Sequence, residues 1–342
     1  MTNVLRVAFF TDTFPPMRDG VAQVADALAG TLRRHGHEVT VFTVQPKGLS
    51  RWESRPDGTR VHRHRSLPAP GYPQYRIALF PFGPAIAPGF RQRFDIVHVH
   101  TPGFVGLAGW LAARGAGTPV VGTYHTDLLG MLRGAARSRA GQSGPGAPRQ
   151  NLSTSTPFST SLGARGNGPR AVERRDSRAA FVGVVGGEGP QSEQVAARLA
   201  DPTRFPCPVR YIGGVPEEEK PALLAQTAVF VLPSLSDTSS VALLEAMASG
   251  AACVVTRRGG PAEIARRSNA GILVDPEDPS EIRGAIEGLL SQPSRARELG
   301  QRARAWVQEN APIGRTAQAF LALYEDLLDE RDRADRTGSL TG

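Results

Sequence analysis

The sequence predicts an α/β protein built from two Rossmann-like domains. Short apolar runs recur along the chain, and most lead through a turn into a segment with helical periodicity, which is the pattern of a parallel sheet with crossover helices. The chain has 342 residues, enough for two domains that each bury a core. A hydrophobic content of 40% is typical of a soluble globular protein. We therefore expect an open sheet in each half, with ligands at the carboxyl ends of the strands.

The N-terminal half begins with a strand–helix–strand unit. The elements expected in this half are strands at residues 5–10, 37–43, 60–65, 95–100 and 119–124 and helices at 20–36 and 106–114. Gly20 opens the first helix after a strand and a turn. A glycine there lets a phosphate approach the backbone N–H groups closely, and the alternative is that it only makes the turn.

An exposed loop is expected after the third strand. Residues 66–84 contain proline and aromatic residues that exclude a long helix. The side chains that favour an exposed apolar and basic loop, rather than a packed surface loop, are Tyr72, Tyr75, Arg76, Leu79, Phe80 and Phe82.

The charge of the chain favours anionic partners. A formal charge of +8 and a pI near 10.2 are compatible with nucleotide phosphates, an anionic membrane surface or nucleic acid. Of these, nucleic acid is the least favoured partner, because the sequence lacks zinc-finger spacing and an RNA-binding aromatic motif. Cys207 and Cys253 lie far apart without metal-ligand spacing, so we expect them to pack, and we expect no metal site.

The middle of the chain does not predict a folded domain. Residues 138–179 are rich in Gly, Ser, Pro and Arg, with few large apolar side chains. Such a segment cannot offset the entropy of ordering, so we expect it to be disordered. The resulting domains are residues 1–137, the disordered segment 138–179, and residues 180–342.

Strand and helix patterns return in the C-terminal half. The elements expected there are strands within 180–190 and at 209–212, 229–232, 252–256 and 272–274, and helices at 191–199, 216–226, 241–249, from 259, and at 279–290, 294–309 and 315–333.

One strand, loop and helix, within residues 228–250, organise this half. Ser239 and Ser240 belong to a hydroxyl cluster that can cap the helix. Glu245 is the one polar residue of an otherwise apolar helix, and a carboxylate buried there needs hydrogen bonds from a ligand or, alternatively, from an adjacent loop. Asp237 precedes it by eight positions, so two acids frame the start of the helix.

The block PSLSDTSSVALLEAMASG, followed by CVVTRRGGPAEI, resembles the acid-x7-acid signature of the retaining glycosyltransferases of family 4, which have a GT-B fold. The resemblance implies that Asp237 lies against the reacting face of the donor sugar and that Glu245 holds the ribose hydroxyls. Family members usually have Glu in place of Asp237 and a Gly-containing loop in place of Ser239 and Ser240. By the same resemblance these four residues bind the donor.

Two N-terminal residues match the same family. Gly20 in PPMRDGVA corresponds to the glycine beside the donor phosphates, and His125 in TYHTD corresponds to a histidine that reaches the donor sugar and phosphates. His98 and His100 are interpreted as strand histidines. The resemblance assigns catalysis to Asp237 and His125. It also implies that the last helices cross back to brace the N-terminal domain, across a cleft from the second domain.

The function implied is transfer of a hexose, with retention, from a nucleotide-sugar to a hydroxyl acceptor, without a metal or other cofactor. PGYPQYRIALFP resembles a stretch of members that glycosylate membrane lipids such as diacylglycerol or phosphatidylinositol, so we expect glycolipid biosynthesis by a cytoplasmic enzyme, peripheral on the inner face of the plasma membrane.

The middle segment leaves two other functions open. Family members carry there an Arg and a Lys that clamp the donor diphosphate, and this chain has neither in a strand-loop-helix context. Family elements are therefore missing in the middle, and the alternatives are an impaired or inactive homologue that acts as a binding module, or a nucleotide-sugar epimerase or hydrolase.

Overall fold

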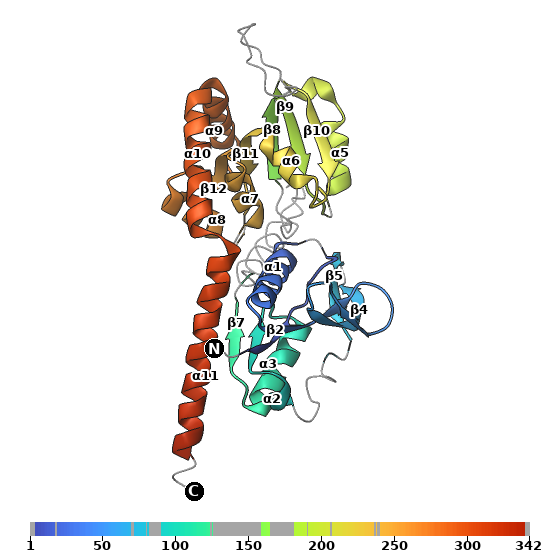
Figure 1. The fold of residues 1–342 in the computed structure, drawn as a ribbon. Coiled ribbons are helices and arrows are strands. Elements are labelled where there is room, and N and C mark those ends of the chain that lie inside the picture. The colour runs from blue at the N-terminus through green and yellow to red at the C-terminus, as the bar shows by residue number, and fades with distance from the viewer. Residues whose placement is uncertain are drawn as a thin grey trace, which may run out of the picture. The chain divides into compact units, whose positions relative to one another are not determined.

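The computed structural model describes residues 4–17, 19–69, 72–79, 81, 90–123, 125, 159–164, 181–189, 191–205, 207–235, 237 and 240–338. The chain forms two compact units, of which unit 1 is Met1–His125 with Pro312–Gly342 and unit 2 is Thr126–Ala311. Each unit contains one sheet with helices on its faces (Figure 1).

Unit 1 is a doubly wound sheet. Its strands are β1 (Arg6–Phe10), β2 (Glu38–Gln45), β3 (Arg51–Ser54), β4 (Arg60–Ala69), β5 (Tyr72–Ala78), β6 (Ile96–Val99) and β7 (Val120–Gly122). Its helices are α1 (Gly20–Arg34), α2 (Phe90–Arg93), α3 (Phe104–Ala116) and α11 (Ile313–Gly338). The strand order is β3-β4-β2-β1-β6-β7, and within this order β4, β2, β1, β6 and β7 run parallel to one another. The order reverses between β1 and β6, which is where such sheets bind ligands.

The expected loop after β4 is partly a strand. β5 pairs antiparallel with β4, and Arg76 donates to the carbonyl of Ser66 at 2.9 Å. Tyr75 is 47% exposed, which agrees with the expected exposure. Phe80 and Phe82 lie outside the described residues.

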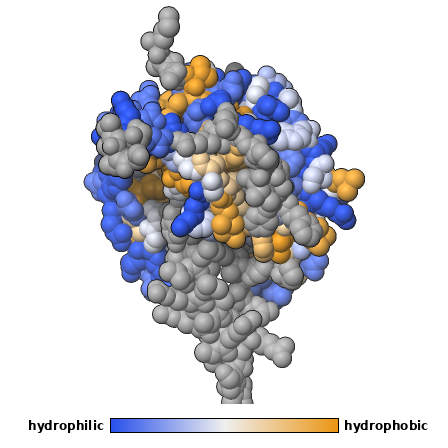
Figure 2. Space-filling view, turned by 90° about the horizontal axis from the view of Figure 1, so that it is seen from below, coloured by the Kyte–Doolittle hydropathy of each residue, from blue (hydrophilic) through white to orange (hydrophobic). Residues whose placement is uncertain are grey.

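The outer face of α3 is apolar. Its exposed large side chains are Phe104, Leu107, Trp110 and Leu111, each between 43% and 51% exposed. A surface helix ordinarily carries polar residues there. Arg114 is the one charged residue of α3, and its guanidinium lies over the Trp110 ring at 5.4 Å. Figure 2, seen from the side on which α2 and α3 lie in Figure 1, shows apolar groups among hydrophilic ones.

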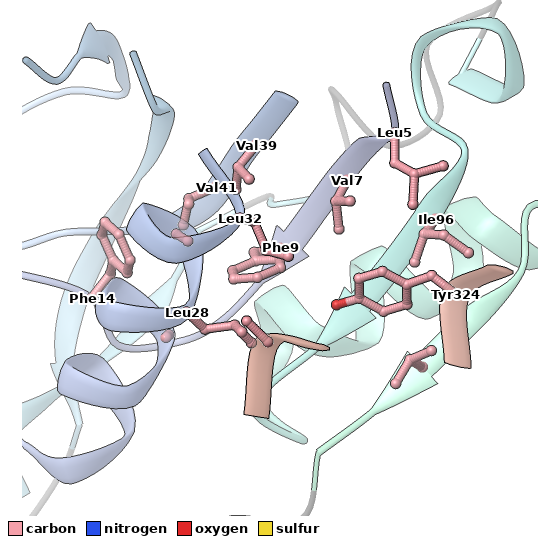
Figure 3. Packing of buried hydrophobic residues seen from close by; sticks show 14 of the residues in the cluster. Leu5, Val7, Phe9, Phe14, Leu28, Leu32, Val39, Val41, Ile96 and Tyr324 are labelled. Carbon is pink, nitrogen blue, oxygen red and sulfur yellow. The ribbon is translucent and has the colours of Figure 1, made fainter. Parts of the chain in front are cut away.

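The opposite face of the unit 1 sheet is covered by α1 and α11. Alternate residues of β1, including Val7 and Phe9, pack there with Leu28 of α1 and Tyr324 of α11 (Figure 3). All four side chains are fully buried, and complete burial of a large apolar side chain contributes about 1.5–3 kcal/mol. The last helix is therefore part of the core of unit 1, which confirms the expectation that it braces the N-terminal domain, although the expected domain boundaries placed it within residues 180–342.

Unit 2 is a second doubly wound sheet. Its strands are β8 (Ser159–Ala164), β9 (Phe181–Gly186), β10 (Val209–Gly213), β11 (Thr227–Leu232), β12 (Ala252–Thr256) and β13 (Gly271–Val274). Its helices are α5 (Ser192–Leu199), the short 3-10 helix η1 (Pro202–Arg204), α6 (Lys220–Ala225), α7 (Val241–Ala248), α8 (Gly259–Ser268), α9 (Pro279–Ser291) and α10 (Pro293–Asn310). The order β10-β9-β8-β11-β12-β13 places β8 where the first strand of a Rossmann sheet stands.

β8 corrects the expectation of disorder for residues 159–164. It runs antiparallel between β9 and β11, with Ser161 opposite Val184 and Phe230. Backbone groups of two flanking strands supply its ladder, and such pairing is not visible in the composition of the segment. Residues 138–158 and 165–179 of the segment lie outside the described residues.

Candidate functional site

A carboxylate from the end of β1 holds the start of α3. Asp12 Oδ1 accepts the Val105 N–H at 2.9 Å, and Asp12 Oδ2 accepts the Thr101 hydroxyl at 2.6 Å. Gly103 occupies the N-cap position of α3 but has no side chain that could accept a hydrogen bond from the helix. A Cβ at this position would lie 2.4 Å from Oδ2 of Asp12. Burial raises the pKa of Asp12, and these hydrogen bonds oppose the shift. Asp12 therefore serves as a helix cap supplied from another strand.

The loop between β1 and α1 is fixed at both ends. Asp19 caps α1 by accepting the Ala22 N–H at 2.9 Å, and Arg63 donates to the carbonyl of Pro15 at 2.6 Å. Gly20 is the first residue of α1. The first N–H groups of a helix have no partner within it, so this fixed start of α1 favours an anion.

His125 follows β7 in the chain. Burial lowers its pKa, and the charge of Asp19 has the opposite, smaller effect. Its Nε2 lies 3.4 Å from Nδ1 of His100.

In unit 2 a half-buried carboxylate on α7 faces a lysine. Glu245 Oε1 lies 3.6 Å from Nζ of Lys220, whose shorter contact, 2.6 Å, is with Glu217. Burial raises the pKa of Glu245, and the nearby Lys220 charge opposes this. Glu245 therefore lacks the full hydration of a surface carboxylate, and its contact with Lys220 is longer than a direct hydrogen bond.

The loop with Asp237 rests on the start of α8. The Gly260 N–H donates to the Asp237 carbonyl at 2.9 Å. Gly259 has φ of +66°, and a Cβ there would lie 2.3 Å from the same oxygen. Ser240 is the N-cap of α7, and its hydroxyl accepts the Leu243 N–H at 3.2 Å. The double glycine thus allows the loop to approach α8.

The expected site residues fall into two groups. Unit 1 holds Gly20 and His125, and unit 2 holds Asp237, Ser240 and Glu245. Ser239 lies outside the described residues.

Sequence reasoning missed two residues that contact this set. Lys220 is the single cation in PEEEKP, which is a signal that could have drawn attention to it. The second residue is His100, which lies 3.4 Å from His125 and which the sequence had indicated, with His98, only as a strand histidine.

The described parts of the chain contain no group of three or more His, Cys, Asp or Glu residues placed to hold a metal ion, and no helix long and apolar enough to cross a membrane. Cys253 is buried, which raises its pKa to about 12 and leaves its thiol unreactive at neutral pH.

Two family models match the chain. Residues 18–154 match the model described as Glycosyltransferase Family 4, and residues 170–306 match the model described as Glycosyl transferases group 1. Residues 155–169 lie between the matches, so the similarity enters the segment 138–179 from both sides. It extends further into the middle than the sequence motifs indicated.

Two relatives are similar over most of the chain. A GDP-mannose-dependent alpha-mannosyltransferase of Mycolicibacterium smegmatis is 26% identical over 96% of this chain and 99% of its own. A GDP-mannose-dependent alpha-(1-6)-phosphatidylinositol monomannoside mannosyltransferase of the same organism is 26% identical over 88% and 93%. The first alignment has 385 positions, more than the 342 residues here, so that relative has segments without a counterpart.

Solved structures show the fold. The sucrose-phosphate synthase of Thermosynechococcus elongatus superposes with a TM-score of 0.62 at 18% identity, covering 95% of this chain and 100% of that one.

Proposed function

The chain belongs to the group 1 glycosyltransferases with the GT-B fold, and on that premise we propose that it transfers a hexose, with retention, from a nucleotide-sugar to a hydroxyl acceptor. The bond between the anomeric carbon and the diphosphate breaks, a bond to the acceptor oxygen forms, and the acceptor proton leaves with the nucleoside diphosphate. The names of both relatives support a nucleotide-sugar donor.

The environment of Glu245 is the observation that carries this proposal. A half-buried carboxylate with a raised pKa gains from hydrogen-bond donors that replace its lost hydration. The two neighbouring hydroxyls of a ribose are such donors, and a carboxylate can accept both. Lys220, at 3.6 Å, is close enough to favour the ionised form of Glu245 that accepts them.

The other expected residues have roles at the sugar and the phosphates. Asp237 would lie at the reacting sugar, next to the capped start of α7 with Ser240. In unit 1, the backbone N–H of Gly20 at the start of α1 suits the diphosphate, and His125 suits the sugar. The chemistry proposed for these residues uses no metal ion.

The acceptor proposed is a lipid at an anionic membrane surface. The apolar face of α3, with Trp110 and Arg114 and no acidic residue, has the composition of a surface that enters the headgroup region of a membrane. Four half-exposed side chains amount to roughly 400 Å². A standard protein interface takes about 800 Å² from each partner, so this face fits a membrane better than a second copy of the chain. One relative is named for a phosphatidylinositol acceptor.

The position of β8 favours a second candidate, an impaired or inactive homologue that binds nucleotide-sugars. In a doubly wound sheet the loop after the first strand approaches the ligand phosphates. β8 is antiparallel to β9 and β11, so its end at Ala164 lies at the opposite edge from the carboxyl ends of those strands. Loss of charged groups at the leaving diphosphate costs several kcal/mol of transition-state stabilisation. A nucleotide-sugar epimerase or hydrolase is the third candidate.

Isothermal titration with nucleoside diphosphates and their sugar conjugates tests the donor site. We expect micromolar binding that is lost in Glu245→Ala and kept in the control Glu263→Gln, which changes an exposed acid of α8. Labelled donor with and without lipid then separates the candidates, because transfer needs the acceptor, hydrolysis does not, and a binding module does neither. Absence of binding across the panel would refute the donor assignment.

Vesicle sedimentation tests the membrane surface separately. Binding to vesicles with anionic lipid should fall at least tenfold in the double variant Leu107→Ser with Trp110→Ser. The control Leu323→Ser removes a 41% exposed leucine from α11 and should change nothing. Equal binding by both variants would contradict a role for α3.

A further inference from the structure

Hydrogen bonds between three side chains connect α11 with the end of β7. Tyr324 Oη lies 2.6 Å from Nδ1 of His98, and Nε2 of the same ring lies 2.6 Å from Oγ1 of Thr123. Figure 3 shows Tyr324 among the buried side chains beside the sheet. Thr123 directly follows β7, and its N–H donates to the carbonyl of Val99 at 2.9 Å. These contacts therefore lead from the core of unit 1 to the carboxyl edge of its sheet, where doubly wound sheets bind ligands.

The middle member of this series is a buried, neutral ring. His98 and Tyr324 are both fully buried. Burial lowers the pKa of His98 to about 3, so the ring carries a single proton at neutral pH. Phe9 and Phe320 pack against it, with ring centroids 5.3 Å and 4.6 Å away. A neutral imidazole has one N–H and one lone pair, so His98 accepts a hydrogen bond on one side and donates one on the other.

The burial of Tyr324 decides the direction of these hydrogen bonds. Among the described residues, the Tyr324 hydroxyl has His98 as its one hydrogen-bond partner. A buried donor without an acceptor is costly, so the phenol proton points at Nδ1 of His98. The proton of the ring is then on Nε2, which donates to Oγ1 of Thr123. Because the Thr123 hydroxyl accepts this bond, its own proton points away from His98.

We infer that Thr123 contacts the nucleotide-sugar, with Tyr324 and His98 as positioning residues that direct the Thr123 hydroxyl proton toward an oxygen of this ligand. The inference rests on the proposed function, because the ligand is the donor proposed above. Thr123 is half-buried, and it lies two positions before His125, the residue proposed for the sugar. A hydroxyl that is fixed as a donor recognises an oxygen that accepts a hydrogen bond, such as a phosphate or sugar oxygen.

Thr123→Val tests the contact, because valine keeps the branched shape of the side chain and removes the hydroxyl. Hydrogen bonds to charged groups are the stronger ones, so the Kd of the ligand should rise about ten- to hundredfold. Thr123→Ser keeps the hydroxyl and should restore a Kd within about threefold of the wild type. The matched control is Thr118→Val. It removes a buried hydroxyl just before β7 that has no hydrogen-bond partner among the described residues, and it should leave the Kd unchanged.

Isothermal titration with guanosine and uridine diphosphates and with their hexose conjugates identifies the oxygen that Thr123 contacts. An equal loss of affinity for a diphosphate and its conjugate in Thr123→Val would support a phosphate oxygen. A loss confined to the conjugate would support a sugar oxygen. A Kd within about twofold of the wild type for both ligands would overturn the inference, since the hydroxyl would then contribute nothing to binding.

Imidazole NMR on the full chain with ¹⁵N-labelled histidine tests the positioning step without a ligand, and seven histidines keep the spectrum tractable. His98 should carry its proton on Nε2. A proton on Nδ1 would overturn the inference, because the Thr123 hydroxyl would then donate to the ring instead of to a ligand. If the wild type binds none of the diphosphates or conjugates, the proposed function fails and the ligand contact with it, whereas the NMR result still decides the direction of the Thr123 proton.

Discussion

Gly259→Ala tests whether the loop with Asp237 depends on its close approach to α8. Gly259 has φ of +66°, and an added Cβ would lie 2.3 Å from the Asp237 carbonyl oxygen, where ordinary contact begins at 3.4 Å. The methyl group therefore has to push the loop away by about 1 Å or shift the start of α8.

Two effects of different size are expected from this substitution. A left-handed conformation costs an alanine about 1–2 kcal/mol, which at about 2–4 °C per kcal/mol lowers Tm by about 2–8 °C. Displacement of a reacting group by about 1 Å can reduce the rate by about a hundredfold. Activity should therefore fall much more than stability.

Thermal unfolding and transfer kinetics are measured on the same samples, with Gly284→Ala as the control. Gly284 lies inside α9 with nothing within 4 Å of an added Cβ. This control should gain about 0.5–1 kcal/mol of stability and keep its activity. Gly259→Ala with wild-type Tm and wild-type kcat/KM would refute the reasoning, since both the strain and the contact would then be absent.

Three further substitutions have expected outcomes. Tyr324→Phe leaves Nδ1 of His98 without its partner and should lower the free energy of unfolding by about 1–3 kcal/mol in denaturant titrations. Arg63→Met removes the buried partner that holds the pKa of Glu53 below its ordinary value. The stability that this ion pair contributes is present above pH 4.5 and is lost as pH falls through the folded pKa of Glu53. Thermal scans should show the gap between wild type and Arg63→Met closing in acid. Burial raises the pKa of Glu245, so protonation of this side chain stabilises the folded state, and that contribution is lost as pH rises through the folded pKa. Because glutamine carries no charge, Glu245→Gln should raise Tm at about pH 7. The same variant should weaken donor binding in titration calorimetry.

The local elements of this fold follow from the sequence, and the long-range ones do not. The strand, cap and helix around Glu245 were predicted within two residues, because an apolar run, a hydroxyl cap and a helical pattern are all local signals. β8 was missed because its place is set by the gap between β9 and β11, and its own residues carry no apolar signal. Pairing by backbone alone leaves little trace in composition.

The residues of the candidate site, too, could be predicted from the sequence only where the signal is local. The spacing of Asp237 and Glu245 marked the pair from sequence, but the contact of Lys220 with Glu245 joins two helices whose relation only the folded sheet determines. His98 was interpreted as a strand residue, and its partner Tyr324 lies 226 positions further along the chain. No periodicity connects residues so far apart.

The membership of α11 in unit 1 affects how the chain is made. All of Thr126–Ala311 is synthesised before α11, which at about 5–20 residues per second takes roughly ten to forty seconds. During that time the sheet face with Val7 and Phe9 is covered by α1 but not by the helix that carries Tyr324. Unit 1 thus cannot complete its core until the end of the chain has been made, and a nascent chain stopped before Ile313 should bind chaperones through that open face.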